Sequence, residues 1–289
     1  MKRSGQRADV ASGTRSDGAA GAVPALERGL RILELLVNYP EGLTQREIAE
    51  RLQCPAASVH RLSQTLLGHG YLTRDEDGRV LRLSRKLVAM GSRVLAEEDW
   101  LGEAMDAAKV LRDAVKETVL IGTLAGEGLV VLGQVLGTHP FKFSVDLGTR
   151  LPLHTAAPAK AMLAFLPAEE RRRLLGQARL EKFNERTLTS VQALEAELAQ
   201  VVEKGYAVDR QEQLTGIHCV AAAVFNRHGY PVAAIWTTGP ADRLREQDFA
   251  SVGMLVTEQA RRISRRLGFG WIPASNQKNG NGKGEDENE

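Results

Sequence analysis

The segment from Leu43 to Arg82 constrains the fold most, because its helix and turn signals follow one another in a fixed order. Thr44 and Glu47 have the S/T-x-x-E spacing of a capping box, which satisfies two unpaired N–H groups and starts a helix. A second helix is predicted to open at Pro55, since proline has no N–H to leave unpaired in a first helical turn. The segment therefore predicts two short helices joined by a tight turn.

The second helix is predicted to be amphipathic. Val59, Leu62 and Leu66 recur at spacings of three and four residues, which indicates one buried face. The residues expected at its start and on its exposed face are Ala56, Ala57, Ser58, His60, Arg61 and Gln64. A hairpin is predicted to follow, with strands at residues 71–74 and 79–83.

The turn of this hairpin is Asp75–Gly78, whose residue types suit a tight turn. A helix-turn-helix followed by such a wing can place its second helix in the major groove of DNA, while basic side chains of the hairpin contact phosphates. Arg74 and Arg79 lie on or beside the predicted wing. A small helical domain whose outer residues are merely solvated is the alternative.

Charge favours the DNA-binding interpretation. Residues 44–93 contain nine Lys or Arg against five Asp or Glu, whereas the whole chain has a formal net charge of only +2. A modest local excess suits specific binding assisted by phosphate contacts. Ser58 can bond a phosphate or a base, Ala57 can contact a thymine methyl group, and Arg61 can bind guanine or phosphate. The predicted DNA-binding residues are Thr44, Gln45, Ala56, Ala57, Ser58, His60, Arg61, Gln64, Arg74 and Arg79.

Composition limits the class of protein. With 289 residues and 43% hydrophobic content the chain is long enough for two domains with ordinary cores. No apolar run approaches the length of a membrane span and the start lacks a signal core, so we expect no membrane partner and a cytoplasmic location. Cys54 and Cys219 lack the C-x-x-C spacing of a metal or redox pair and are expected to be reduced.

The expected organisation has five parts. Residues 1–22 and 269–289 are expected to be disordered tails, the first of them with a DNA-contacting basic arm as the alternative. The DNA-binding domain is expected at 23–84, with Leu26, Leu30, Leu33 and Val37 marking a helix that completes its core. A linker helix is expected at 85–99, marked by Leu87, Met90, Val94 and Leu95, followed by a second domain at 100–268.

The second domain combines hairpins and helices. A helix from Trp100 is followed by a predicted hairpin at 118–124 and 128–136 and a second at 220–225 and 232–238. Further helices are predicted at 157–165, 168–176, 190–205 and 249–267. Strands grouped in hairpins with helices before, between and after them predict an α+β layer on an antiparallel sheet, which can enclose a pocket.

Several short motifs occur in a joint order along both domains. They are LERGLRIL (26–33), SVHRL (58–62), LPLHTA (151–156), KA (160–161), GYAVD (205–209), CVAA (219–222) and GP (239–240). On these motifs the chain, from about Pro24 to Leu267, resembles the IclR family of bacterial transcriptional regulators. The resemblance implies a winged helix-turn-helix joined by a linker helix to an effector-binding domain similar to GAF and profilin-like folds.

The resemblance also implies partners. Family members form homodimers or tetramers on double-stranded operator DNA and control catabolic genes, as repressors or activators, in response to small metabolites that are often carboxylates. A two-fold dimer implies a pseudo-palindromic operator with half-sites about one helical turn apart, or a multiple of that.

The family's effector-binding positions fall on Ala157, Pro158, Asp209, Cys219, Trp236 and Thr238. A helix N-terminus at Ala157 would offer N–H groups to a carboxylate. Pro158 lacks the N–H that relatives have there, and Trp236 replaces a small polar residue. We therefore expect a larger and flatter acid, aromatic or cyclic, with plain core packing as the alternative role of Trp236.

Other residues near these motifs have simpler predicted roles. Cys219 is expected to behave as a small buried hydrophobe, His154 to orient its loop, and Lys160 to lie on the helix surface. An enzyme with Cys219, His218 and Asp209 as a nucleophile set is disfavoured because neighbours on a strand point to opposite faces. No phosphate-binding glycine loop, zinc-helix motif or carboxylate pair is found, so no cofactor and no catalysis are expected. A ligand-binding protein without operator binding remains the second alternative, although it leaves the wing arginines unexplained.

Overall fold

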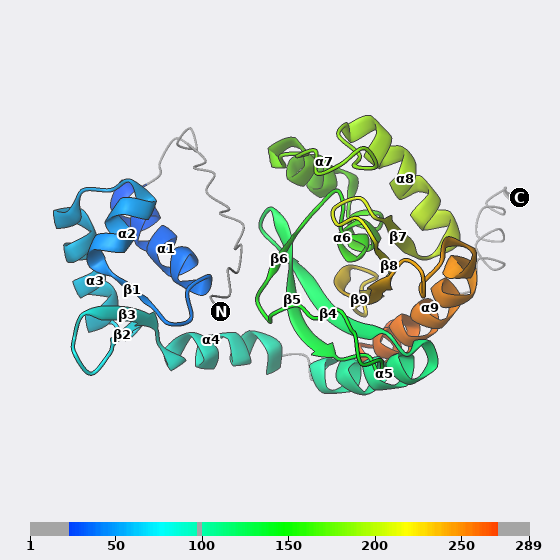
Figure 1. Cartoon of the computed structure of the whole chain (residues 1–289), viewed down its shortest axis with the longest axis horizontal. Coiled ribbons are helices and arrows are strands. Elements are labelled where there is room, and N and C mark those ends of the chain that lie inside the picture. Colours follow the sequence, from blue (N-terminus) through cyan, green and yellow to red (C-terminus); the bar gives the residue numbers. More distant parts are fainter. Residues whose placement is uncertain (1–22, 97–99, 271–289) are drawn as a thin grey trace, which may run out of the picture. The chain divides into compact units, whose positions relative to one another are not determined.

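The computed structural model describes residues 23–96 and 100–270, and the chain divides into two compact units, Met1–Glu97 and Glu98–Glu289 (Figure 1). The predicted tail at 1–22, the end of the linker helix at 97–99 and residues 271–289 lie outside the described residues. Phe269 was expected in the C-terminal tail, but its ring packs against Phe225 at 5.3 Å between centroids.

The first unit is a helix-turn-helix with a wing. Its elements are α1 (Pro24–Val37), β1 (Leu43–Thr44), α2 (Gln45–Leu52), α3 (Ala56–Gly68), β2 (Leu72–Arg74), β3 (Val80–Leu83) and α4 (Arg85–Ala96). The strands form one antiparallel sheet in the order β1-β3-β2. The core consists of Ile32, Leu36, Leu43, Ile48, Val59, Leu72 and Leu81. β1 pairs the residues just before α2 with the wing, a strand that the sequence pattern did not predict.

Local signals fix the start and the end of α2 and the start of α3. The Thr44 hydroxyl accepts a hydrogen bond from Glu47 N at 3.3 Å, and the Glu47 carboxylate accepts one from Thr44 N at 2.8 Å, so the predicted capping box is present. Gln53 ends α2 in the left-handed region with φ 52°. Helix α3 begins at Ala56, one residue later than predicted, because the ψ of 132° at Pro55 keeps that residue extended.

The first helix buries a stripe that differs from the predicted one except at Leu33, which is half-buried and packs against the core. Gly29, Ile32 and Leu36 face the core, whereas Leu26 is 62% exposed and Leu30 and Val37 are each 50% exposed. Both stripes have helical spacing, so periodicity alone does not distinguish them. The consequence is a row of apolar side chains on the outer face of α1.

A tight turn joins the two strands of the wing, and the fourth helix follows the second strand. Asp75 accepts hydrogen bonds from Arg79 N at 2.8 Å and Val80 N at 3.0 Å, and Gly78 has the positive φ of 70° that the turn requires. Helix α4 spans Arg85–Ala96 within the described residues, and Met90, predicted on its apolar face, is 47% exposed.

The second unit is built on one antiparallel sheet. Its elements are α5 (Trp100–Val115), β4 (Thr118–Ala125), β5 (Gly128–Val135), β6 (Arg150–Pro152), α6 (Ala157–Leu163), α7 (Ala168–Gln177), α8 (Val191–Lys204), β7 (Ala207–Arg210), β8 (Ile217–Phe225), β9 (Pro231–Pro240), the short 3-10 helix Glu246–Asp248 and α9 (Phe249–Arg266). The strand order is β6-β5-β4-β9-β8-β7. Both predicted hairpins are present, and β4 pairs with β9 to join them.

Helices cover both faces of this sheet. Helices α5 and α9 pack on the face that carries Val119, Ile121 and Val220, and α6, α7 and α8 lie on the face that carries Leu120 and Trp236 (Figure 1). Successive strand residues therefore alternate between two apolar cores. The predicted α+β fold, a winged helix-turn-helix followed by a domain of helices on an antiparallel sheet, is confirmed. Within the described residues, no helix combines the length and the apolar character that crossing a bilayer requires.

Candidate nucleic-acid interface and ligand site

Helix α3 presents a polar outer face to solvent. His60, Arg61 and Gln64 are exposed, as are Ala56 and Ala57 at the helix start. On the opposite side Val59 is buried against the core, with Leu62 and Leu66 half-buried beside it. The side chains predicted to meet the bases thus all point away from the interior of the unit, except for Ser58, which is half-buried.

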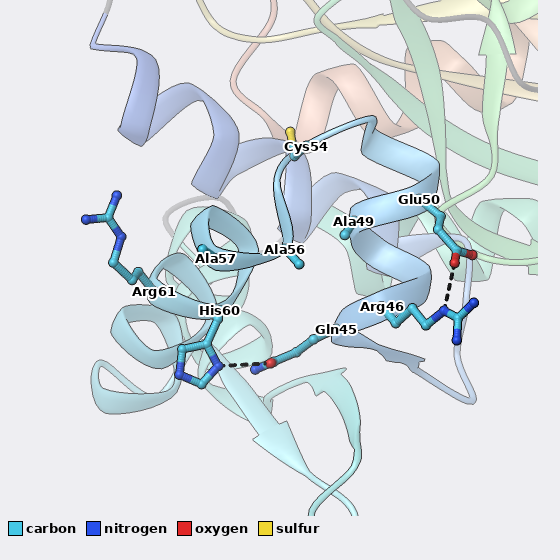
Figure 2. A pocket seen from close by; sticks show the side chains of 9 residues that line it. All are labelled: Gln45, Arg46, Ala49, Glu50, Cys54, Ala56, Ala57, His60 and Arg61. Carbon is cyan, nitrogen blue, oxygen red and sulfur yellow. Dashed lines mark hydrogen bonds and ion pairs between the residues drawn. The ribbon is translucent and has the colours of Figure 1, made fainter.

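A groove of about 880 Å³ runs between α2 and α3 (Figure 2). Its lining residues are Gln45, Arg46, Ala49, Glu50, Cys54, Ala56, Ala57, His60 and Arg61. The groove brings together five of the predicted DNA-binding residues. Within it, His60 Nδ1 lies 3.1 Å from Gln45 Oε1, and Arg46 pairs with Glu50 at 2.9 Å.

Ser58 has a partner that sequence reasoning missed. Arg28 on α1 donates from Nη1 to Ser58 Oγ at 3.0 Å and from Nε to Pro24 O at 3.1 Å. The Ser58 hydroxyl accepts from Arg28, so its own proton is left for a phosphate or a base acceptor. Thirty residues separate Arg28 from Ser58, so no local pattern could link them.

The wing adjoins the start of α2. A cavity of about 390 Å³ is lined by Thr44, Gln45, Arg46, Arg74, Gly78, Arg79 and Leu81. Arg74 and Arg79 are exposed, although Arg74 also donates to Gly78 O at 3.0 Å and so braces the turn. The Thr44 hydroxyl donates to Glu47 Oε2 at 2.8 Å and accepts from Glu47 N at 3.3 Å, so both of its capping-box contacts help to position the start of α2.

The candidate ligand residues lie on three neighbouring strands. Asp209 on β7 is paired in register with Cys219 on β8, and Cys219 is paired with Thr238 on β9. The Cys219 thiol lies 3.2 Å from Thr238 Oγ1. Helix α6, which starts at Ala157 and Pro158, packs against all three strands. The structure therefore places five of the six predicted positions around one corner of the sheet.

Burial controls the charge at this corner. Asp209 is 7% exposed, and desolvation raises the pKa of its carboxyl, although Oδ1 accepts a hydrogen bond from Glu212 N at 2.7 Å. Burial also raises the pKa of the Cys219 thiol well above its ordinary value. His218 points to the other face, where its ring meets Phe249 edge to face at 5.1 Å. A protonated thiol and a histidine on the opposite face do not form a nucleophile set.

The sixth position, Trp236, is packed in the apolar core. Its side chain is 2% exposed and clusters with Leu120 and Leu129. The indole lies against Gly122, where an added Cβ would be 3.2 Å from Trp236 Cη2 and 2.5 Å from Val130 O. The indole thus occupies space along the sheet floor that a small side chain would leave open.

Lys160 does not lie on the helix surface as predicted but is completely buried. Its Nζ lies 2.6 Å and 2.8 Å from the two carboxylate oxygens of Glu212 and 2.6 Å from Glu197 Oε1. Burial raises the pKa of Glu212 to about 7 against the attraction of Lys160. Neither glutamate was predicted, because each becomes Lys160's neighbour only through the tertiary fold.

His154 holds the loop that precedes α6. Its Nε2 lies 2.9 Å from Glu181 O, and its ring stacks on Phe183 at 5.9 Å. Burial lowers the pKa of the imidazole, which favours the neutral form. The predicted orienting role of His154 agrees with these contacts.

Comparison with known proteins identifies the family. Residues 25–76 match the model of the IclR helix-turn-helix domain, and residues 93–265 match that of the C-terminal domain of the bacterial transcriptional regulator IclR. The chain belongs to the IclR family. It is 32% identical over 254 residues to the HTH-type transcriptional regulator BhcR of Paracoccus denitrificans, covering 88% of this chain and 89% of BhcR.

Solved structures agree with this assignment. The crystal structure of Thermotoga maritima IclR has 30% identity and a TM-score of 0.62, covering 84% of this chain and 98% of that one. An IclR homologue from Microbacterium hydrocarbonoxydans, complexed with 4-hydroxybenzoate, shares the fold with 22% identity and a TM-score of 0.69, covering 84% and 99%. With the family models and the BhcR match, the chain is a transcriptional regulator with a DNA-binding helix-turn-helix and an IclR-type C-terminal domain, and not an enzyme.

Proposed function

We propose that the chain binds a pseudo-palindromic operator as a homodimer or tetramer and changes its DNA affinity when a small carboxylate binds the second unit. The observation that carries this proposal is the outer face of α3, where His60, Arg61 and Gln64 are exposed beside the basic wing. We further propose that it acts in the cytoplasm and controls a catabolic operon, as its family commonly does.

The proposed interface divides the work between two kinds of contact. Arg74 and Arg79 on the wing would contact phosphates and so position the unit on the duplex. The side chains that would face base edges or the adjoining backbone in the major groove are Ala56, Ala57, Ser58, His60, Arg61 and Gln64 on α3 and Gln45 on α2. Arg28 would support this set by holding Ser58.

The outer face of α1 supports a homo-oligomer. Val23, Leu26, Leu30 and Val37 are each at least half exposed, although they are large and apolar. Contiguous apolar side chains on a surface usually mark an association site. Pairing of two such faces would give the two-fold symmetry that a pseudo-palindromic operator requires.

The proposed effector site is the corner formed by Ala157, Pro158, Asp209, Cys219 and Thr238, with Trp236 as its floor. Cys219 and Thr238 offer polar groups, and burial raises the pKa of the Asp209 carboxyl at the same corner. The indole favours a flat acid, and 4-hydroxybenzoate, the compound bound by the Microbacterium homologue, is a suitable first probe.

Selection of duplexes from a random library, followed by footprinting on the protein's own promoter, tests the DNA-binding proposal. Arg61→Ala is expected to weaken specific binding by about 1–3 kcal/mol. Arg172→Ala, which removes an exposed arginine from the second unit, serves as the matched control and should leave affinity unchanged. Absence of any sequence preference over random DNA would favour the alternative, a ligand-binding protein without an operator.

Thermal shift with a panel of carboxylic acids, including 4-hydroxybenzoate, tests the effector site. Binding is expected to raise the melting temperature of the full chain by mass action. Trp236→Ser should shift the preference towards smaller acids, because it opens the floor of the site. An unchanged ligand preference in this variant would contradict the placement of the site.

A further inference from the structure

The hydrogen bond between Gln45 and His60 joins the two helices of the DNA-binding unit across their groove (Figure 2). Gln45 is the first residue of α2, and His60 lies in the second turn of α3. The amide oxygen of Gln45 lies 3.1 Å from Nδ1 of the imidazole. An amide oxygen can only accept a hydrogen bond, so this contact requires an imidazole that carries a proton on Nδ1.

This contact sets the hydrogen-bonding polarity of the remaining ring nitrogen. In a neutral imidazole with a proton on Nδ1, Nε2 is an acceptor. The contact with His60 turns the amide oxygen of Gln45 towards the imidazole, and its N–H donors remain for other partners.

Among the α3 side chains that line the groove, His60 is the one that can accept a hydrogen bond from a base. Ala56 and Ala57 present only methyl groups, and Arg61 carries only donors. Arg46 and Glu50, on the opposite wall, are paired with each other at 2.9 Å. His60 thus offers a hydrogen-bond acceptor, whereas Arg61, the next residue in the sequence, offers only donors.

We propose that Gln45 and His60 form one base-reading unit, in which Gln45 fixes the imidazole and His60 Nε2 accepts a hydrogen bond from the exocyclic amino group of adenine or cytosine. The inference rests on the proposed function and names the base class that this position reads. In the major groove, adenine N6 and cytosine N4 are donors, whereas guanine O6 and N7 and thymine O4 are acceptors. A guanine or thymine facing Nε2 would leave two acceptors opposed without a proton between them.

The first experiment removes single amino groups from the DNA. Operators are selected from a random duplex library with the full chain, and each adenine or cytosine of the selected site is then replaced by its analogue without the amino group. One position in each half-site should lose affinity by roughly 3- to 10-fold, the size of one neutral hydrogen bond. With His60→Ala the same replacement should have no further effect, since the two changes remove the same contact.

The second experiment reverses the polarity. In Gln45→Glu the carboxylate still accepts from Nδ1 and favours the protonated imidazole, whose Nε2 is then a donor. Selection with this variant should replace adenine or cytosine by guanine or thymine at the His60 position on the same strand. Gln53→Glu, the same charge change at the opposite end of α2, is the matched control and should keep the original preference.

The outcomes separate the inference from the proposed function. If the wild-type chain selects no sequence, the operator proposal fails and the inference fails with it. If a site is selected but no amino group matters in a His60-dependent way, or if loss of guanine N7 by 7-deaza substitution matters in that way, the inference alone is overturned. Because His60 is exposed, an unchanged melting temperature of His60→Ala confirms that the variant folds.

Discussion

Replacing Lys160 by Met is expected to destabilise the second unit by about 3–5 kcal/mol at pH 8, because the change removes the cation from a buried cluster of carboxylates. Lys160 is fully buried, and its Nζ lies within 2.8 Å of both Glu212 oxygens and 2.6 Å from Glu197. The Glu212 side chain is only 4% exposed, so its charge cannot turn to water when the lysine is lost. Glu197, at 19%, can partly do so.

The loss of stability caused by Lys160→Met should be larger at high pH than at low pH. The pKa of Glu212 is raised by burial from 4.5 to about 7, so the folded state binds its proton more tightly than the unfolded state. The stability from this group is fully present below pH 4.5 and is lost as the pH rises through about 7. Without Lys160 the pKa rises further, so at pH 5.5 Glu212 is protonated and the cost should fall to roughly 1–2 kcal/mol, mainly lost hydrogen bonds and packing.

Urea unfolding followed by tryptophan fluorescence measures this effect. Trp100 and Trp236 are buried in the second unit, and residues 1–99 contain no tryptophan, so the change in their signal reports on the unfolding of the second unit. Lys160→Met with Glu212→Gln should recover most of the loss at pH 8, because the double variant leaves no unpaired charge at position 212.

Lys182 supplies the control for this series. It is 54% exposed and pairs with Glu185 at 2.8 Å, so Lys182→Met should cost less than about 0.5 kcal/mol. The reasoning is refuted if Lys160→Met costs less than about 1 kcal/mol at pH 8, or costs the same at pH 5.5 and pH 8.

Three further predictions concern the DNA-binding unit. Thr44→Ala removes the capping box and should cost about 1 kcal/mol, seen as faster amide exchange along α2. Gly42→Ala should destabilise the unit by about 1–3 kcal/mol in thermal melts, since φ is +85° and an added Cβ would lie 2.5 Å from Leu81 O. Gly68→Ala is the matched control. A Cβ added at Gly68 would have no other atom within 4 Å, so this change should not lower the melting temperature. Arg79→Ala should weaken binding to all DNA sequences alike and reduce the slope of log affinity against log salt by about one, measured by fluorescence anisotropy.

Elements with local signals could be predicted from the sequence. The Thr44–Glu47 capping box, the Asp75–Gly78 turn and the spacing of Val59, Leu62 and Leu66 each depend on residues within one or two turns. Such signals fix helix starts, hairpins and exposed faces with little help from the rest of the chain. The helix-turn-helix and the outer face of α3 were predicted correctly for this reason.

Features that depend on distant partners could not be predicted. The buried stripe of α1 is chosen by what packs against it, so Ile32 and Leu36 face inward in place of Leu26 and Leu30. Strands β6 and β7 have three and four residues, too few for an alternating pattern to emerge. Lys160 has the appearance of a surface residue until the fold brings two glutamates to it.

The turn that follows β7 shows how such distant partners can determine a local conformation. Gln211 has φ 64°, a left-handed conformation that costs a residue other than glycine on the order of 1–3 kcal/mol. Its carbonyl accepts from Asn184 at 2.8 Å, while Glu212 donates to Asp209 at 2.7 Å and its carbonyl accepts from Thr187 at 2.7 Å. These bonds, and not the preference of the chain itself, hold the turn.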